Sequence, residues 1–568
     1  MLRKGIAVLL CLILTLGTFV GCTDQSASGN VFLSAEQYTE IKKTRKDVTP
    51  DEPVDVLVNG TKALYEKERG VYFYSITDDD AWETLTLTVG EYDTAYVTDF
   101  EKETKAEFLA TNRDVLALAY NKEEYIRLSL VFTTMPLLSV TTQTLPENLR
   151  YEDDGEDYEV RKDEDGKDIP YDPYEAPPED IDKPIGEYNT FVNVTLLDPH
   201  AAEHGYENGF TSIARAHIRG RSSRKYPKNS YKLELLEEVD GVLVERDMPL
   251  LGMRKDGDWN LNGMYSEPSK VRDKVSADIW LAITADRQYP GVSSGYRCEY
   301  IEVLVNGLYH GLYLMTERID RKQVGLTNED IMYFSEGDLG KHFTDFLNCD
   351  DNDDMEISGY SLKWPKERSA PYQEWVPFGE LVKAMPAMPS NFNTSPFSIN
   401  VNSLADYEVF IQAVCGVDNV IQNTYYIARK QENGQYEFSF VPWDLDQTFG
   451  VRWSGEEPLL TYVDPYSAEM NLNHFWVCRG MTYRNTENYP SVVKDRYNAL
   501  RETVISNEAM KTMVEEAFAT VQGSGAWMRN KSRWPDGGYD NNPYTITDFI
   551  DRRMGYLDNL YRAGYAGN

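Results

Sequence analysis

Histidine, paired cysteines and positive charge are all scarce in this sequence of 568 residues. Six histidines leave little room for a Ser/His/Asp hydrolase or for a zinc site built from histidines. Six cysteines occur without a CxxC or CxxH spacing, which argues against a zinc-binding module. Lys and Arg total 57 against 93 Asp and Glu, and the net charge of −36 disfavours binding to nucleic acid phosphates. Nucleic acid is therefore not among the expected partners.

A long apolar run stands at the N-terminus, where two basic residues precede GIAVLLCLILTLGTFV. The run is short for a membrane-spanning helix and ends at Gly21, directly before Cys22. This pattern is typical of a bacterial lipoprotein, in which residues 1–21 are a cleaved signal peptide and Cys22 carries the lipid. Residues 22–30 then form a flexible tether. An uncleaved N-terminal anchor is the alternative, and both interpretations place the protein outside the cytoplasm, anchored to the membrane of a bacterial cell envelope.

Four further cysteines lie far apart in the sequence. An extracytoplasmic compartment permits one disulfide, but the sequence leaves its pairing open, and buried thiols are the simpler expectation. The four are Cys298, Cys349, Cys415 and Cys478.

Composition divides the rest of the chain into three regions. Residues 31–148 alternate apolar and polar side chains in short runs such as GVYFYSI and YIRLSLVF, which indicates a small β-rich domain. Residues 149–186 form an acidic, proline-containing linker or insertion that cannot build a core of its own. Residues 187–568 mix strand and helix patterns, so the expected fold class is α+β.

Within residues 187–568, strands come first and helices dominate later. YIEVLVNGLYHGLYLMTERI predicts two strands joined at Asn306-Gly307, and KVRDKVSADIWLAITA has helical spacing. NSLADYEVFIQAVCGV predicts another helix with Ser403 as its N-cap. NTYYIARK, QENGQYEF and SFVPWDLDQTFG predict a hairpin that ends in carboxylates, and the C-terminal third is expected to be mainly helical.

The clearest chemical signal is a set of oxygen-bearing side chains around that hairpin. Asp418 and Asn423 lie five residues apart, which is the spacing of the catalytic Asp and the metal-binding Asn in protein kinases. Asp444 and Asp446 follow, and on an extended strand both side chains point the same way, as two hard ligands for Mg²⁺ or Ca²⁺. One carboxylate to accept a proton and several oxygens to hold a metal indicate phosphoryl transfer.

A basic segment upstream suits the phosphates of a nucleotide. IRGRSSRKYPKNSYKLEL supplies Gly220, Ser222 and Ser223 together with several cations directly before a strand. Backbone and hydroxyl donors there are able to cover phosphates while one lysine contacts them. A basic β-hairpin without a ligand is the alternative interpretation of this segment.

Five segments in the same order resemble the CotH family of spore coat protein H kinase-like proteins. The resemblance implies an atypical protein-kinase-like domain within residues 187–568, with a mixed β N-lobe and a mainly helical C-lobe. It also implies ATP as co-substrate, Mg²⁺ or Mn²⁺ as cofactor, and Ser or Thr side chains of a protein as acceptors. The matching segments are IRGRSSRKYPKNSYKLEL (218–235), DWNLNGMYSEPSKVRDKVSADIW (258–280), VLVNGLYHGLYLMTERID (303–320), VDNVIQNTYYIARK (417–430) and VPWDLDQTFG (441–450).

The resemblance implies roles for individual residues. Asp418 resembles the aspartate that orients and deprotonates the acceptor hydroxyl. Lys232 resembles the strand lysine that contacts the α- and β-phosphates, with Lys228 as a close competitor. The residues expected to hold the metal are Asn423, Asp444 and Asp446, and those expected near the nucleotide also include Arg219, Ser222 and Glu317.

We therefore expect a lipid-anchored protein that transfers the γ-phosphate of ATP to Ser or Thr of a partner protein, with Ser/Thr-rich proteins as one class of partner. The alternative is a non-catalytic adhesion or scaffold module at the cell surface, in which the aspartates hold a structural divalent cation. A calcium-dependent glycoside hydrolase is a third hypothesis, because paired carboxylates also serve sugar hydrolysis.

Overall fold

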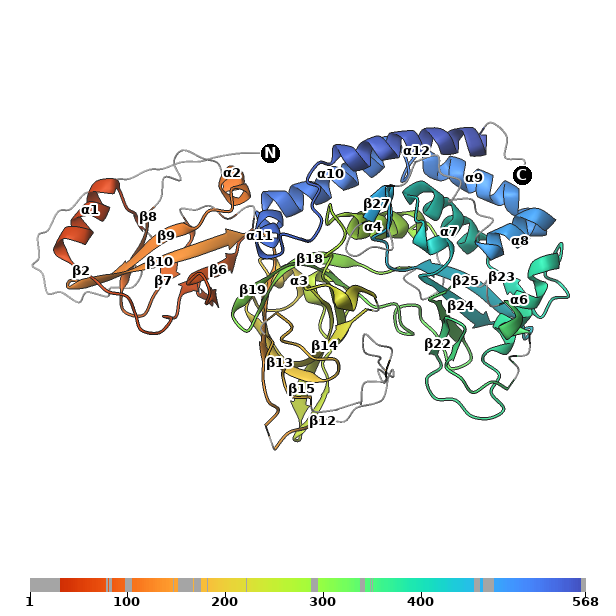
Figure 1. Cartoon of the computed structure of the whole chain (residues 1–568), viewed down its shortest axis with the longest axis horizontal. Helices are drawn as coiled ribbons and strands as arrows, with labels where there is room; N and C mark the ends of the chain where they lie inside the picture. Colours follow the sequence, from red (N-terminus) through yellow and green to blue (C-terminus); the bar gives the residue numbers. More distant parts are fainter. Residues whose placement is uncertain are drawn as a thin grey trace, which may run out of the picture.

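The computed structural model describes residues 31–562 (Figure 1) apart from 78–79, 81–83, 98–104, 147, 152–166, 168–174, 181, 221, 288–294, 338–342, 348, 350, 454–459 and 463–474. The predicted signal peptide, lipidation site and tether lie outside the described residues, as does most of the acidic segment 149–186. Among the helices that the structure describes, none combines the length and the apolar character needed to cross a membrane.

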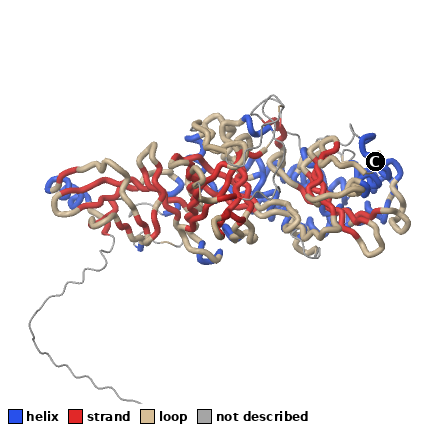
Figure 2. Tube along the Cα trace, turned by 90° about the horizontal axis from the view of Figure 1, so that it is seen from below, coloured by secondary structure: helices blue, strands red, loops and turns tan. Residues whose placement is uncertain are grey.

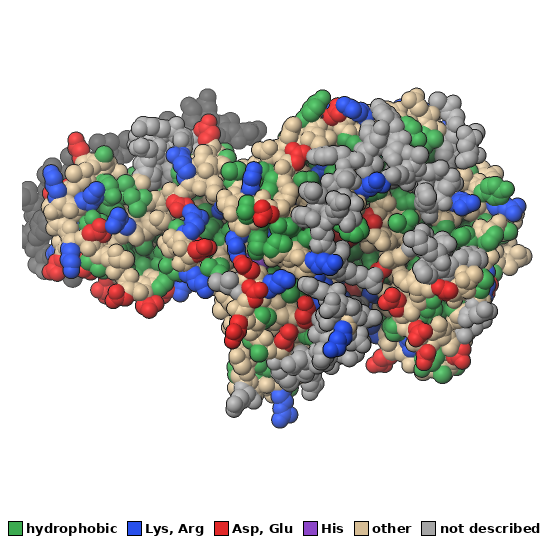
Figure 3. Space-filling view, in the orientation of Figure 1, with side chains coloured by type: hydrophobic (Ala, Val, Ile, Leu, Met, Phe, Trp, Pro, Cys, Tyr) green, Lys and Arg blue, Asp and Glu red, His purple; other side chains and the backbone are tan. Residues whose placement is uncertain are grey.

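Strands and helices are both abundant, which confirms the α+β class. Figure 2 shows three strand-rich regions that follow one another along the long axis of the molecule. Helices gather beside the last of these regions (Figure 1). On the face seen in Figure 3, Asp and Glu side chains are distributed over all three regions.

The first region contains a seven-stranded sheet. In spatial order its strands are β1 (Val31–Phe32), β8 (Asp93–Val97), β9 (Val115–Tyr120), β10 (Glu124–Thr133), β6 (Val71–Ser75) and β5 (Leu64–Glu66), and β2 (Lys46–Asp47) also pairs with β10. Phe73, Ala117 and Leu130 belong to its buried core. The other elements here are α1 (Ala35–Thr44), α2 (Lys105–Ala110) and a small sheet of β3 (Leu57–Val58), β4 (Thr61–Lys62) and β7 (Leu87–Thr88).

The second region contains a closed seven-stranded barrel. In spatial order its strands are β14 (Phe210–Arg219), β13 (Thr190–Leu197), β11 (Leu137–Thr142), β18 (Cys298–Val305), β19 (Leu308–Thr316), β17 (Asp258–Asn262) and β15 (Ser230–Val239). The barrel closes because β15 pairs with both β17 and β14. Alternate residues such as Val192, Val194 and Leu196 of β13 lie in one buried apolar cluster. Outside this ring lie β16 (Val242–Glu245), β12 (Arg150–Tyr151) and α3 (Ala201–His204).

Strand β11 lies within residues 31–148, yet it is a barrel strand. It pairs with β13 on one edge and with β18 on the other. The alternating pattern of its residues identifies a strand but not the partners of that strand, so the sequence grouped it with the first sheet.

The third region combines a six-stranded sheet with helices. In spatial order the strands are β21 (Glu356–Ile357), β22 (Tyr360–Trp364), β20 (Ile331–Ser335), β24 (Thr424–Lys430), β25 (Tyr436–Pro442) and β23 (Phe397–Ile399). One large apolar cluster joins this sheet to the helices. The helices are α4 (Arg272–Thr284), α6 (Val376–Ala384), α7 (Val401–Val414), α8 (Trp476–Arg484), α9 (Tyr489–Arg501), α10 (Asn507–Gly523), α11 (Ala526–Arg533) and α12 (Tyr544–Arg562), and β26 (Val451–Trp453) pairs with β27 (Leu460–Tyr462).

Most local predictions for this half of the chain are confirmed. The turn between β18 and β19 has positive φ at Asn306 (50°) and Gly307 (74°), as a tight hairpin requires. The N-cap of α7 was predicted wrongly: Asn400 caps the helix, and its side chain accepts the N–H of Ser403 at 2.9 Å. Asn is as good an N-cap as Ser and stands three residues earlier, so the helix starts there. The four cysteines after residue 30 are buried free thiols.

A buried ion pair connects the three regions. Arg529 of α11 donates to Glu302 of β18 from Nε at 2.7 Å and from a terminal nitrogen at 2.6 Å. The same guanidinium donates to Thr133 of β10 at 3.0 Å. Glu302 is fully buried, so this charged contact fixes the end of the first sheet against the barrel and the C-terminal helices.

Candidate functional site

The site is built on the turn between α7 and β24. Helix α7 ends where Cys415 adopts a left-handed conformation with φ 56°, and a short 3-10 helix, η7 (Asp418–Val420), follows. Asn423 also has a positive φ of 56°, which Asn tolerates better than most residues. Its Nδ2 donates to Asp418 Oδ2 at 2.6 Å. The structure thus brings the predicted Asp-x4-Asn pair into direct contact.

The carboxylate of Asp418 is held at both oxygens. Gln422 Nε2 donates to Oδ1 at 2.6 Å, while Asn423 occupies Oδ2. The pKa of Asp418 is raised to about 6, mainly by burial and to a smaller degree by the charge of Asp444, while the Gln422 hydrogen bond acts in the opposite direction. A carboxylate with this pKa is largely ionised at neutral pH and is able to accept a proton.

The β24–β25 hairpin returns the chain to this turn. Thr424 pairs with Pro442, so the residue after β25 lies opposite the residue before β24. The Trp443 N–H accordingly donates to the Asn423 carbonyl at 2.9 Å. Asn419 Nδ2 donates to the carbonyl of Trp443 at 2.8 Å. These bonds place Asp444 directly beside the turn that carries Asp418.

Asp444 and Asp446 are not on an extended strand, contrary to the sequence prediction. Strand β25 ends at Pro442, and Asp444 has φ 56°, so the chain turns there. The Asp444 side chain keeps contact with solvent, yet the surrounding protein reduces the solvation of its carboxylate and raises its pKa. Burial raises the pKa of Asp446 well above its usual range, with further contributions from Asp444, Asp273 and Asp418. Asp273, Asp418 and Asp444 are therefore close enough to Asp446 for their charges to affect its pKa.

Asp273 is the site residue that the sequence-based assignment missed. It stands at the start of α4, accepts the Tyr296 hydroxyl at 2.7 Å, and accepts the Asn262 amide at 3.0 Å. Its pKa is raised to about 6, mainly by burial and in part by the charge of Asp444. Both Asn262 and Asp273 lie in the second segment that resembles the CotH family (258–280). Membership of that segment is the sequence feature that could have indicated Asp273 as a site residue. These residues line a narrow pocket of about 10 Å³ whose other walls are Arg219, Thr316, Trp443 and Asp444.

Two of the predicted phosphate-binding cations lie at or near this pocket. Arg219, the last residue of β14, places its guanidinium 5.8 Å from the centre of the Trp443 ring, and its charge favours ionised Asp444. Lys232 of β15 is buried and lies 3.0 Å from Asp258 Oδ1 on the neighbouring strand β17. Asp258 also pairs with Arg318, so Lys232 belongs to a buried charged network on the barrel.

The other predicted nucleotide contacts lie elsewhere. Lys228 is buried; its amine donates to Leu312 O and, at 2.8 Å, to Asn530 Oδ1. Glu317 accepts the backbone N–H groups of Arg254 at 2.8 Å and Arg297 at 2.9 Å. These contacts give both side chains a role in holding loops and helices to the barrel. Ser222 belongs to the one-turn helix η3 (Ser222–Lys225), and its side chain is not described.

Asp418, Asp444 and Asp446 do not form a group of three carboxylates whose oxygen atoms all lie within 4.8 Å of one another. Among the described residues, Glu245, Asp247 and Asp256 form such a group. Lys322 lies 3.1 Å from Glu245 and Arg254 pairs with Asp256, so cations of the protein already balance that group. Burial is the main cause of the raised pKa values of Asp444 and Asp446, and the charge of Asp444 also contributes to the rise for Asp446.

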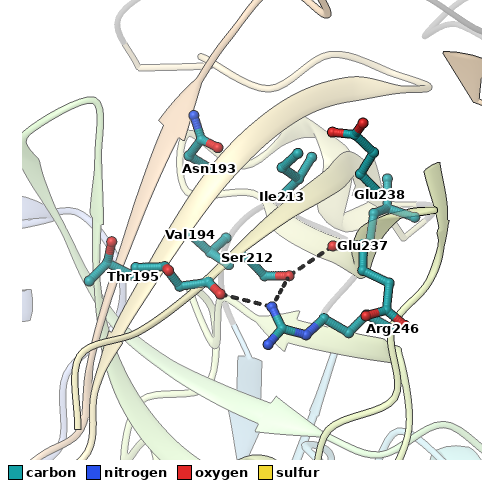
Figure 4. Close-up of a pocket in the computed structure, with 10 residues that line it drawn as sticks. Asn193, Val194, Thr195, Ser212, Ile213, Glu237, Glu238 and Arg246 are labelled. Carbon is teal, nitrogen blue, oxygen red and sulfur yellow. Dashed lines mark hydrogen bonds between the residues drawn. The ribbon is translucent and has the colours of Figure 1, made fainter. Parts of the chain in front are cut away.

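A larger pocket lies along strands of the barrel (Figure 4), and Asp273, Asp418, Asp444 and Asp446 are not among its lining residues. It is open, encloses about 450 Å³, and is lined mainly by β13, β14 and β15. Its arginine, Arg246, donates to Thr211 O at 2.9 Å and to Ser212 Oγ at 3.2 Å. Because the cation in this pocket is already hydrogen-bonded to the protein, the pocket does not indicate an anionic ligand.

Comparison with known proteins agrees with the sequence resemblance. The family model described as CotH kinase protein matches residues 216–557, from β14 to α12. Inner spore coat protein H of Bacillus subtilis (strain 168) is 24% identical over 257 residues. That alignment covers 43% of this chain and 61% of the relative, so less than two thirds of the relative is matched. The family match spans more than half of the chain, and the protein belongs to the CotH family.

Proposed function

We propose that this protein is an atypical protein kinase that transfers the γ-phosphate of ATP to Ser or Thr of a partner protein, with Mg²⁺ or Mn²⁺. The observation that supports the proposal most is the Asp418–Asn423 contact beside Asp444. It joins a carboxylate of suitable pKa to oxygen donors of the type that hold a magnesium ion on phosphates.

The donor set fits a hard divalent cation. Asp444, Asp446 and the side-chain oxygen of Asn423 would hold the ion, because carboxylate and amide oxygens are its preferred ligands. The ion would supply charge neutralisation between the phosphates. Burial disfavours the ionised forms of Asp444 and Asp446, and the nearby charges of Asp444, Asp273 and Asp418 add to this effect at Asp446, so a bound cation would stabilise the ionised carboxylates.

The chain's own side chains have separate tasks in the proposed reaction. Asp418, oriented by Gln422 and Asn423, accepts the proton of the acceptor hydroxyl at one carboxylate oxygen. Arg219 and Lys232 supply positive charge on the barrel side, toward the phosphates. The pocket between Arg219 and Trp443 is too narrow for a nucleotide in this conformation, so ATP binding displaces the Arg219 side chain from the Trp443 ring.

We also propose that the barrel and the helix-rich third region correspond to the two lobes of a kinase-like fold. The carboxylates come from the third region, which includes α4, whereas Arg219 and Lys232 come from barrel strands. The name of the Bacillus subtilis relative suggests a role outside the cytoplasm, which agrees with lipid anchoring through Cys22. A Ser/Thr-rich envelope or coat protein is the partner that we propose.

Transfer of labelled γ-phosphate to a Ser/Thr-rich protein and to the chain itself tests the proposal. We expect Asp418→Asn and Asp444→Asn each to reduce incorporation by about 10²–10⁴-fold. Asp495→Asn is the matched control, because Asp495 is an exposed aspartate on α9. Equal incorporation by the wild type and both site variants would reject the kinase assignment.

A non-catalytic adhesion or scaffold module is the second candidate function. The observation that favours it is the complete hydrogen bonding of Asp418 by Gln422 and Asn423, which also serves a purely structural turn. In that case, the aspartates would hold a structural cation. Binding of a cell-surface partner that is unaffected by Asp418→Asn and Asp444→Asn, together with no phosphate transfer, would favour this function.

A further inference from the structure

A second cluster of ligating side chains, unused by the proposed kinase chemistry, lies directly after β13. It contains two of the six histidines of the chain, His200 and His204. The His204 N–H donates to the His200 carbonyl at 3.1 Å, so the two residues are one helical turn apart. Their ring centres are 6.2 Å apart. Two histidines four residues apart on one helix face are a known spacing for ligands of one metal ion.

A carboxylate lies within hydrogen-bond distance of Nδ1 in each imidazole ring. His204 Nδ1 lies 2.6 Å from Asp198 Oδ2, and His200 Nδ1 lies 3.3 Å from Glu203 Oε1. An ionised carboxylate only accepts hydrogen bonds, so the ring proton of each neutral histidine resides on Nδ1. The lone pair of each ring is then on Nε2. This is the arrangement in which carboxylates orient metal-binding histidines in proteins.

Both Nε2 atoms are available. Neither has a hydrogen-bond partner among the described residues, and the side chains are 48% exposed for His200 and 24% exposed for His204. Gly252 packs against the same edge of the His204 ring, and a Cβ atom there would lie 3.1 Å from Nε2, so a larger residue at this position would cover the nitrogen. His200 occupies the N-cap position of α3, but its side chain makes no capping hydrogen bond. The ring therefore has no evident structural task.

The support beneath the two rings is rigid. The Asp198 side chain is only 1% exposed, and its second oxygen accepts the His200 N–H at 2.9 Å. The Tyr206 hydroxyl donates to the same oxygen that faces His204, and Asn208 accepts the Asp198 N–H at 3.0 Å. A fixed carboxylate holds the His204 ring in one orientation before a ligand arrives, which reduces the entropy lost on binding.

We propose that Nε2 of His200 and Nε2 of His204 bind one late first-row divalent metal ion, with Zn²⁺ as the type. Imidazole nitrogen suits Zn²⁺, Ni²⁺ and Cu²⁺, whereas Mg²⁺ prefers the oxygen ligands of the carboxylate site. Water or a side chain of a bound partner completes the coordination. This metal site is separate from the proposed kinase chemistry and does not depend on it.

Calorimetric titration of ZnCl₂ into the full chain, without a histidine tag and in excess Mg²⁺, tests the proposal. We expect one Zn²⁺ per chain and an affinity that falls by about 10- to 100-fold in His200→Ala and in His204→Ala. His342→Ala, His474→Ala and Asp444→Asn are controls that retain the wild-type affinity. Unchanged Zn²⁺ affinity in both test variants, or an equal loss in a control, would overturn the proposal.

A spectroscopic measurement keeps the proposal testable if one variant is unstable. His200 is half-exposed, so His200→Ala is the variant expected to fold normally, as thermal melting will establish. Electron paramagnetic resonance of the protein with one equivalent of Cu²⁺ should show coupling to two nitrogens, and to one in His200→Ala. The same spectrum in the wild type and in His200→Ala would contradict a two-histidine site.

Discussion

Asn423 holds the carboxylate of Asp418 from the far end of the same turn, with Nδ2 2.6 Å from Oδ2. Gln422 bonds the other oxygen at the same distance. Both oxygens of the proposed base are thus oriented before an acceptor arrives, and little ordering remains for the reaction step. Asn423 differs from Gln422 in having a second task, because its oxygen is a proposed metal ligand.

This difference is testable with two alanine substitutions. We expect Asn423→Ala to lower the kcat of phosphate transfer by about 10²-fold, because it removes a positioning bond and a metal ligand. Gln422→Ala removes only a positioning bond and should cause a smaller loss. Steady-state kinetics at saturating and limiting Mg²⁺ measure this, and added Mg²⁺ should partly restore Asn423→Ala alone. A larger loss in Gln422→Ala would contradict the assigned metal role.

Substitution of Lys228 should affect stability, whereas substitution of Lys232 should affect nucleotide binding. Lys228→Met removes a buried donor from the Leu312 carbonyl and from Asn530 Oδ1, which then keeps the Leu312 N–H at 3.1 Å, so we expect a loss of about 1–3 kcal/mol in the free energy of unfolding. Its ATP affinity should stay unchanged. Lys232→Met should weaken ATP binding, because a phosphate-binding cation is lost. Thermal melting and ATP titration of both variants measure this, and the reverse pattern would show that Lys228 is the phosphate ligand.

The Arg529–Glu302 pair should strongly stabilise the packing of the three regions against one another. Arg529→Met leaves the fully buried Glu302 without its cation, and we expect a loss of about 3–5 kcal/mol in the free energy of unfolding. The double variant Arg529→Met/Glu302→Gln should recover much of this loss, because no buried charge remains. Urea unfolding followed by tryptophan fluorescence measures both. A double variant less stable than Arg529→Met would contradict this explanation.

His310 should make the stability depend on pH. Burial, with contributions from the charges of Lys228 and Arg533, lowers its pKa to about 3. In the unfolded chain the pKa is about 6.5, so between these values the unfolded state binds a proton that the folded state does not. Folding stability is therefore lost as pH falls from about 6.5 to about 3, by up to about 1.4 kcal/mol per pH unit from this residue.

The variant His310→Gln isolates this contribution. It keeps a hydrogen-bonding group near the Tyr313 hydroxyl, which lies 2.8 Å from His310 Nδ1, but it does not titrate. The slope of unfolding free energy against pH should be smaller in the variant than in the wild type below pH 6.5. Equal slopes would show that His310 is protonated in the folded protein.

The sequence predicted contacts within one turn much better than contacts between distant segments. Asp418 and Asn423 are close because a short turn joins them, so their spacing was enough. Asp273 comes from a helix far earlier in the chain, and only tertiary packing brings it to Asp444. The left-handed conformation of Asp444 could not be predicted from the sequence either, because aspartate adopts it rarely and the neighbouring residues do not require it.

For the fold, too, local features were easier to predict than contacts between distant segments. The hairpin at Asn306-Gly307 was predictable because its turn residues favour positive φ. The barrel was not, since its closure depends on pairing between β15 and β17 and on the transfer of β11 to a sheet formed later in the chain. The alternating pattern of a strand indicates which of its residues are buried, but it does not specify which strand lies next to it.

Calorimetric titration of ATP into the full chain, in Mg²⁺ and in EDTA, tests the central claim most directly. We expect one ATP to bind in Mg²⁺, much weaker binding in EDTA, and loss of the Mg²⁺-dependent part in the variant Asp444→Asn/Asp446→Asn. Asp495→Asn should behave as the wild type. No ATP binding in Mg²⁺, or an ATP affinity that is the same in Mg²⁺, in EDTA and in the double variant, would contradict a metal-dependent nucleotide site at these aspartates.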